Sequence, residues 1–138
     1  MYKAILIPID GSVNAEKAAG HGLEIARLTN AKVVILYVID NRLFQGLSKS
    51  EIVPYLKNLS AKAQEYIKKV SGMVPGLSYE EIIVQGFPAE EIIKIAEDER
   101  IDLIVMGTRG ITGPKRLLLG STAEEAIKFA QCAVLVVK

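Results

Sequence analysis

Three glycines and a basic residue near the end of the chain have the spacing of an anion-binding loop. The stretch contains Gly107, Gly110 and Gly120, with Arg109 between the first two and Ser121 directly after the third. Glycine has no Cβ, so the backbone can adopt positive φ and approach a ligand closely. Free backbone N–H groups and the positive end of a helix dipole then favour an anion. The loop is therefore predicted to hold phosphate.

The two ends of this loop are predicted to be a strand and a helix. Residues 101–106 form a short apolar run that suits a strand buried on both faces. Residues 121–124 match the capping box, in which Ser121 would be the N-cap of a helix. The glycines are equally suited to be plain turn residues, and Ser121 to be only a cap. Lys115 and Arg116 add positive charge, although basic loop residues are more often solvated.

The residue types offer little for chemistry beyond binding. The glycines match neither G-x-G-x-x-G nor the P-loop pattern, and Gly46-Leu-Ser-Lys-Ser has the wrong spacing for the latter. With one histidine (His21) and one cysteine (Cys132), a Ser-His-Asp or Cys-His arrangement has almost no material. No His/Cys cluster has the spacing of a zinc site. We therefore expect no catalytic residues, and at most weak hydrolysis of a bound nucleotide.

Length and charge narrow the class of protein further. The 138 residues predict a single domain over 1–138, long enough to bury a core. A formal net charge of +1 gives no overall field that would attract nucleic acid. No apolar run approaches the roughly 18 residues of a membrane span, and the chain starts directly with a strand pattern, so we expect no signal peptide. The lone cysteine fits a reducing compartment, and we expect a cytoplasmic protein.

Strand and helix patterns alternate from one end of the chain to the other. Apolar runs predict strands at residues 2–9, 32–39, 79–85, 102–106 and 133–137. Helical spacing and capping signals predict helices at residues 14–29, 48–71, from 86–88 onward, and 121–130. This alternation predicts an α/β protein with one parallel sheet covered by helices on both faces. Ligands of such sheets bind outside the carboxyl ends of the strands, where the strand order switches direction.

The pattern Gly107-x2-Gly110-x9-Gly120-Ser121 resembles the G-2x-G-9x-G-(S/T) signature of nucleotide-binding universal stress proteins. The resemblance covers nearly the whole chain, including the opening ILIPIDGS, the segment YVID, and the closing GITGPKRLLLGSTAEEAIKFAQCAVLVV. It implies a single open five-stranded sheet in the order 3-2-1-4-5, of the Rossmann-like or adenine nucleotide alpha hydrolase-like type. It also implies an adenine-nucleotide binder that is usually a homodimer.

The resemblance further implies a set of nucleotide contacts. Asp10 would lie near the ribose or base, although by itself it is equally suited to be a turn former. The other adenosine, ribose and first-phosphate contacts would be Pro8, Ile9, Val38, Met106, Gly107, Arg109 and Gly110. The outer phosphates would meet Gly120, Ser121 and Thr122. ATP is the expected ligand, with ADP or AMP as alternatives, and its phosphates would carry Mg²⁺ with Asp10 or Ser121 as candidate protein ligands.

Three functions of different classes stay open on the sequence. The favoured one is an ATP-binding regulatory or stress-response module with an unidentified protein partner. The alternatives are a ligand-free dimerisation module with a vestigial loop, and a slow ATP-hydrolysing or adenylating enzyme of the same fold. A dimer has its own rationale, because residues 133–137 are apolar and would expose unpaired backbone groups at a sheet edge. Pairing with the same strand of a second copy would cover that edge symmetrically.

Overall fold

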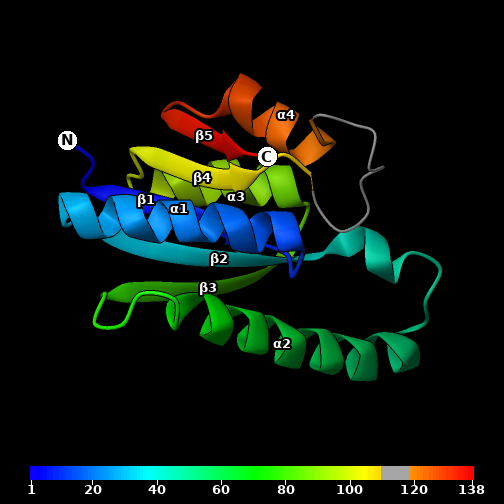
Figure 1. Cartoon of the computed structure of the whole chain (residues 1–138). Helices are drawn as coiled ribbons and strands as arrows, with labels where there is room; N and C mark the ends of the chain where they lie inside the picture. The colour runs from blue at the N-terminus through cyan, green and yellow to red at the C-terminus, as the bar shows by residue number, and fades with distance from the viewer. Residues whose placement is uncertain (110–118) are drawn as a thin grey trace.

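The structure is a computed structural model that describes residues 1–109 and 119–138. One parallel five-stranded sheet forms the centre, and helices cover both of its faces (Figure 1). The strands are β1 (Ala4–Ile9), β2 (Lys32–Asp40), β3 (Tyr79–Gly86), β4 (Leu103–Gly107) and β5 (Ala133–Val137). The helices are α1 (Val13–Thr29), the 3₁₀ helix η1 (Asn41–Phe44), α2 (Lys49–Ser71), α3 (Pro88–Asp98) and α4 (Ser121–Phe129).

The strand order is β3-β2-β1-β4-β5, which confirms the predicted topology. The order switches direction between β1 and β4, so a ligand crevice is expected there. The β1–β2 ladder reaches the end of β1, where Ile9 is level with Tyr37. The β1–β4 ladder, in contrast, stops at Leu6 and Ile104. Pro8 has no backbone N–H to donate to a neighbour, and the sheet opens between these two strands toward their carboxyl ends.

Each face of the sheet carries its own apolar layer. The layer under α1 and α2 includes the fully buried Ile7, Ile35 and Ile67. The layer under α3 and α4 includes Leu6 and Ile104, which are equally buried. Successive strand residues point to opposite faces, so a strand covered on both sides must be apolar at every position. This explains why the central strands are continuous apolar runs in the sequence.

The start of α4 differs from the sequence prediction. The N-cap is Gly120, with φ −78° and ψ 163°, and its carbonyl accepts a hydrogen bond from the Glu124 amide at 3.0 Å. Ser121 is therefore the first residue of the helix, and the capping box predicted over 121–124 does not form. The reason is tertiary, because the Gly120 N–H donates to the carbonyl of Thr108 and sets the helix start one residue earlier. A capping box does form at the start of α2, where Glu51 Oε1 accepts a hydrogen bond from the Ser48 amide at 3.3 Å.

A serine side chain caps the start of α1. Ser12 is the N-cap of α1, and its Oγ accepts a hydrogen bond from the Ala15 amide at 3.1 Å. We expect Ser12→Ala to lower the free energy of unfolding by about 1 kcal/mol, because an amide of the first turn loses its acceptor. Urea denaturation measures this difference. Ser78→Ala, at an exposed serine before β3, is the control and should change stability by less than about 0.5 kcal/mol. Equal losses in the two variants would contradict the capping role.

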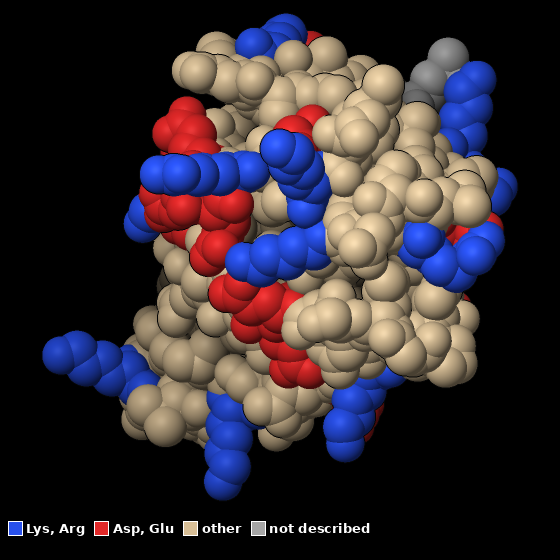
Figure 2. Space-filling view, turned by 90° about the vertical axis from the view of Figure 1, so that its left-hand side faces the viewer, with Lys and Arg blue, Asp and Glu red and all other residues tan. Residues whose placement is uncertain are grey.

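The amino ends of the strands carry charges of both signs. Figure 2 views the molecule from this end, where basic and acidic side chains lie interleaved. Lys32 Nζ, at the start of β2, is 3.0 Å from Glu80 Oε2 and 3.4 Å from Glu99 Oε2. Because neighbouring charges compensate one another, no large field of one sign develops on this face. None of the helices in the described parts of the chain has the length and hydrophobicity to cross a membrane.

Candidate functional site

The carboxyl ends of β1, β2 and β4 meet the start of α4 at one end of the molecule, on the right in Figure 1. The sequence-predicted site residues within the described ranges belong to these strand ends, to the residues directly after them, or to the start of α4. They are Pro8, Ile9, Asp10, Val38, Met106, Gly107, Arg109, Gly120, Ser121 and Thr122. Gly110 lies outside the described residues. The topology thus brings together segments that are about a hundred residues apart in the sequence.

The apolar members of this set belong to different faces of the sheet. Val38 and Met106 pack in the layer under α3 and α4, whereas Ile9 belongs to the layer under α1 and α2. Met106 and Ile9 are each only 5 % exposed, so they offer a ligand backbone rather than side-chain surface. Val38 is half-buried. Of these three residues, Val38 therefore has the most exposed apolar side chain, on the α3–α4 side of the sheet.

Asp10 forms the turn that follows β1. Its Oδ1 accepts a hydrogen bond from the Ser12 amide at 2.9 Å, which is an Asx turn. Gly11 between them has φ +86°, a conformation that favours glycine. The turn-forming role left open by the sequence is therefore present. It also places a half-buried carboxylate at the carboxyl end of the central strand.

Thr108 joins the ends of β4 and β5 to the starts of α1 and α4. Its N–H donates to the Val137 carbonyl at 3.0 Å, and its carbonyl accepts from the Gly120 N–H. Its hydroxyl accepts a hydrogen bond from Asn14 Nδ2 at 3.4 Å, and Asn14 Oδ1 accepts from Arg109 Nε at 3.4 Å. Thr108 is 8 % exposed, a buried polar residue with its groups satisfied. Sequence reasoning missed the positioning roles of Thr108 and Asn14, and the only local signal was a threonine between a strand-ending glycine and Arg109.

Gly107 and Gly120 are needed because other backbone segments approach them closely. A Cβ on Gly107 would lie 3.0 Å from the backbone carbon of Asn14. A Cβ on Gly120 would lie 3.2 Å from both Arg109 Cα and the Thr108 carbonyl oxygen. Neither glycine has a positive φ. The physical role of both is therefore close packing of backbone, which seats the start of α4 against the end of β4.

A pocket of about 170 Å³ opens beside this junction, between η1 and the starts of α3 and α4. It is lined by Arg42, Phe87, Pro88, Ala89, Glu90, Ser121, Thr122 and Glu125. Arg42 Nε donates to both carboxylate oxygens of Asp40, at 3.0 and 2.9 Å. Partial burial of the Asp40 carboxylate favours a higher pKa, but the hydrogen bonds from Arg42 outweigh it and lower the pKa of Asp40. The same hydrogen bonds raise the pKa of the Arg42 guanidinium. Sequence analysis missed Arg42 and Phe87, which only the sheet order brings beside α4.

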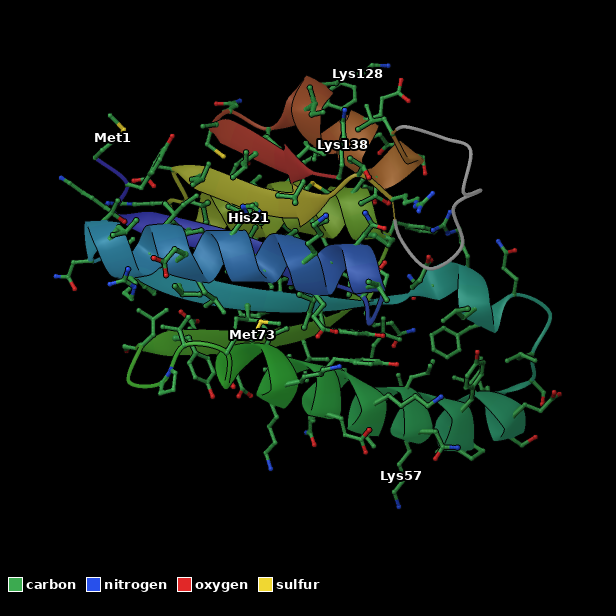
Figure 3. The ribbon with its side chains drawn as sticks, viewed as in Figure 1. Met1, His21, Lys57, Met73, Lys128 and Lys138 are labelled. Atoms are coloured by element: carbon green, nitrogen blue, oxygen red, sulfur yellow. The ribbon has the colours of Figure 1, made fainter. Side chains whose placement is uncertain are left out.

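The single histidine and the single cysteine of the chain do not lie at this end. His21 is exposed half-way along α1 (Figure 3). Cys132 lies before β5 in the layer under α3 and α4, where burial and then the charge of Asp102 raise the pKa of its thiol. Among the described residues, no group of three or more His, Cys, Asp or Glu side chains could hold a metal ion. What converges at the strand ends is instead backbone amides, hydroxyls, a carboxylate and the guanidinium of Arg109.

The open parallel sheet with a switch point beside an uncapped helix start defines a doubly wound α/β protein, a class whose ligand sites lie at that switch. Within this class, the chain belongs to the universal stress protein family, whose family model matches residues 1–138. The match spans every strand and helix described above.

Relatives of known sequence and structure support this assignment. Two universal stress proteins of Methanocaldococcus jannaschii are 45 % and 44 % identical to the chain; both alignments cover 100 % of it, and 83 % and 96 % of the relatives. The solved structure of the second superposes with a TM-score of 0.88 at 42 % identity, covering 100 % of this chain and 96 % of that one. A universal stress protein from Archaeoglobus fulgidus, solved in complex with dAMP, gives a TM-score of 0.65 at 26 % identity, covering 99 % and 98 %.

Proposed function

We propose that this chain binds an adenine nucleotide at the carboxyl ends of β1 and β4, and that it acts as a cytoplasmic regulatory module of the stress response. The observation that carries the proposal is the start of α4. Its N-cap, Gly120, has no side chain, and no side-chain hydrogen bond caps the helix. The first amides of the helix and the positive end of its dipole therefore stay available to an anion. The hydroxyls of Ser121 and Thr122 lie at the same helix start.

The remaining contacts are proposed from the family resemblance, and the described residues among them lie at or just after the ends of strands or at the start of α4. The base would meet Val38, with the backbone of Pro8, Ile9 and Met106 beside it, and the ribose would meet Asp10. The first phosphates would follow Gly107, Arg109 and Gly110. Mg²⁺ typically keeps several waters and needs only one or two protein ligands besides the phosphates. Asp10 and Ser121 are the residues proposed for that role.

The dAMP-bound relative from Archaeoglobus fulgidus supports the choice of an adenine nucleotide. ATP is the form proposed here, because the uncapped start of α4 is suited to further phosphates beyond the first. Binding rather than turnover is proposed because the described site residues include no evident nucleophile–base pair. The nucleotide would then act by changing the dimer or the affinity for a partner protein.

The small-molecule content of the purified protein tests the proposal. We would denature the protein and identify released nucleotides by mass spectrometry, then titrate nucleotide-free protein calorimetrically with Mg·ATP, Mg·ADP and AMP. The expected result is saturable binding at one nucleotide per chain, tightest for Mg·ATP. Absence of binding for all three nucleotides would refute the site and favour the ligand-free dimerisation module. Release of ADP at a steady enzymatic rate would instead favour the hydrolase alternative.

The free edge of β5 supports a proposed homodimer. Within residues 1–109 and 119–138, β5 pairs with β4 alone, so its other edge has no strand partner there and would present unpaired backbone groups. Leu135 in the middle of β5 is 36 % exposed, and Ile127 and Phe129 of α4 are exposed at 48 % and 62 %. A second copy pairing through residues 133–137 would cover the edge and add apolar contact.

We expect Leu135→Glu to convert this dimer to monomer. Two carboxylates would be brought together across a two-fold axis, where like charges and their desolvation oppose association. Sedimentation velocity at micromolar concentration measures the shift. Val53→Glu, at a valine of α2 that is 69 % exposed, introduces the same charge elsewhere and should leave the mass unchanged. A wild-type protein that sediments as a monomer would refute the proposed dimer.

A further inference from the structure

The aromatic ring of Tyr66, on α2, packs directly on the turn that carries Asp10. A Cβ placed on Gly11 would lie 2.6 Å from both Cε2 and Cζ of Tyr66, so the ring lies flush against the backbone of this turn. Gly11 has φ +86°, so both its conformation and its neighbour exclude a side chain. The hollow left beside the ring measures about 10 Å³, which is no larger than one water molecule needs. The turn and the ring therefore form one packed unit.

A second ring extends this unit into the sheet. Tyr37 of β2 stacks on Tyr66, with 6.1 Å between ring centroids and 5° between ring planes. Tyr37 is level with Ile9, the residue before Asp10. Burial and then the negative charge of Asp10 raise the pKa of the Tyr37 hydroxyl. The two rings thus support the Asp10 turn from the side of α1 and α2.

The position of α2 against the turn is held by a further contact. One helical turn beyond Tyr66, Lys69 Nζ lies 3.2 Å from Glu16 Oε2 on α1. Because this ion pair is exposed to solvent, its contribution to stability is small. The pair nevertheless joins α2 to α1, the helix that Ser12 caps. Within the turn itself, the Ser12 amide donates a hydrogen bond to Asp10 Oδ1. The Asp10 carboxylate is therefore oriented from within the turn and supported laterally by α2.

We propose that Tyr66 is a positioning residue for the nucleotide site, whose ring holds the Asp10–Gly11 turn so that the Asp10 carboxylate meets the hydroxyls of the ribose. The inference rests on the proposed function and makes that function more specific. It says that the contact between α2 and the turn after β1 allows the site to select a nucleotide with ribose hydroxyls. Tyr66 does not touch the ligand itself. Loss of the ring would leave Gly11 without its packing partner and free the turn to move.

The test compares ligands with and without ribose hydroxyls. Calorimetric titration would give the dissociation constants of Mg·ATP and Mg·2′,3′-dideoxy-ATP for the wild type, Tyr66→Phe and Tyr66→Leu. We expect Tyr66→Leu to bind Mg·ATP about tenfold more weakly, the size of one impaired hydrogen bond to a charged group. Its affinity for the dideoxy nucleotide should change less than about twofold. Tyr66→Phe keeps the ring and should behave as the wild type with both ligands.

The outcomes separate this inference from the proposed function. Equal weakening toward both nucleotides in Tyr66→Leu would show that the ring only supports the whole site, which overturns the inference. A loss in Tyr66→Phe as large as in Tyr66→Leu would overturn it as well. A wild type that binds neither nucleotide would overturn the proposed function itself. If Tyr66→Leu fails to fold, Tyr66→Met also removes the ring while keeping a longer apolar side chain, and it should give the same split between the two nucleotides.

Discussion

Replacing Gly120 with valine is expected to abolish nucleotide binding while leaving the fold intact. A Cβ at this position already lies 3.2 Å from Arg109 Cα and from the Thr108 carbonyl oxygen, and the branched side chain extends further. The start of α4 must then move away from the end of β4, which breaks the hydrogen bond from Gly120 to Thr108. The φ and ψ of −78° and 163° suit valine, so the backbone itself is not strained. The amides of α4 would be displaced from the position proposed for the phosphates.

Calorimetric titration with Mg·ATP measures this effect. We expect the affinity to fall by at least about 100-fold, or about 2.8 kcal/mol of binding free energy. Gly20→Val is the matched control, because a Cβ on Gly20 of α1 meets no atom within 4 Å. This control should bind Mg·ATP as the wild type does. Binding by Gly120→Val within threefold of the wild type would refute the assignment of the phosphates to the start of α4.

Replacing Gly22 with leucine is expected to give the largest loss of stability. Gly22 lies where α1 crosses the sheet, and a Cβ there would be 2.8 Å from Ile7 Cδ1 and 3.2 Å from Val105 Cβ. Ile7 and Val105 are both fully buried in the layer under α1. The remaining atoms of a leucine have no space in a close-packed interior, and overpacking of this kind costs about 3 kcal/mol at the upper end of its usual range. We therefore expect α1 to be lifted from the sheet.

Urea denaturation of a matched pair of variants tests this prediction. Gly20→Leu makes the same change two residues earlier in α1, at a position with open space around it. There the higher helix propensity of leucine should raise the free energy of unfolding by about 0.5 to 1 kcal/mol. Gly22→Leu should lower the denaturation midpoint, and Gly20→Leu should raise it. Shifts of the same sign in the two variants would contradict the close contact between α1 and the sheet.

The same pair shows where sequence reasoning succeeds and where it stops. Helical spacing alone places Gly22 and Ala18 on one face of the helix predicted at residues 14–29, because helical periodicity depends only on nearby residues. The neighbours of Gly22, Ile7 and Val105, could not be named, since they follow from which strands lie under α1. The start of α4 shows the same limit. The capping pattern of residues 121–124 depends on nearby residues alone. The hydrogen bond from the Gly120 N–H to the Thr108 carbonyl, which joins distant segments, places the helix start one residue earlier.

The sequence by itself determined the alternation of strands and helices, and with it one parallel sheet, because both follow from residue types and spacing within segments of the chain. The edge position of β5 came from the family resemblance, and the glycine loop as the place for a phosphate stays a prediction. Only the tertiary structure decided that Thr108 holds α4 against β4 and that Tyr66 lies on Gly11. It also decided that Arg42 and Phe87 line a pocket with Ser121. These contacts join segments that are far apart in the chain, and the strand order alone brings such segments together.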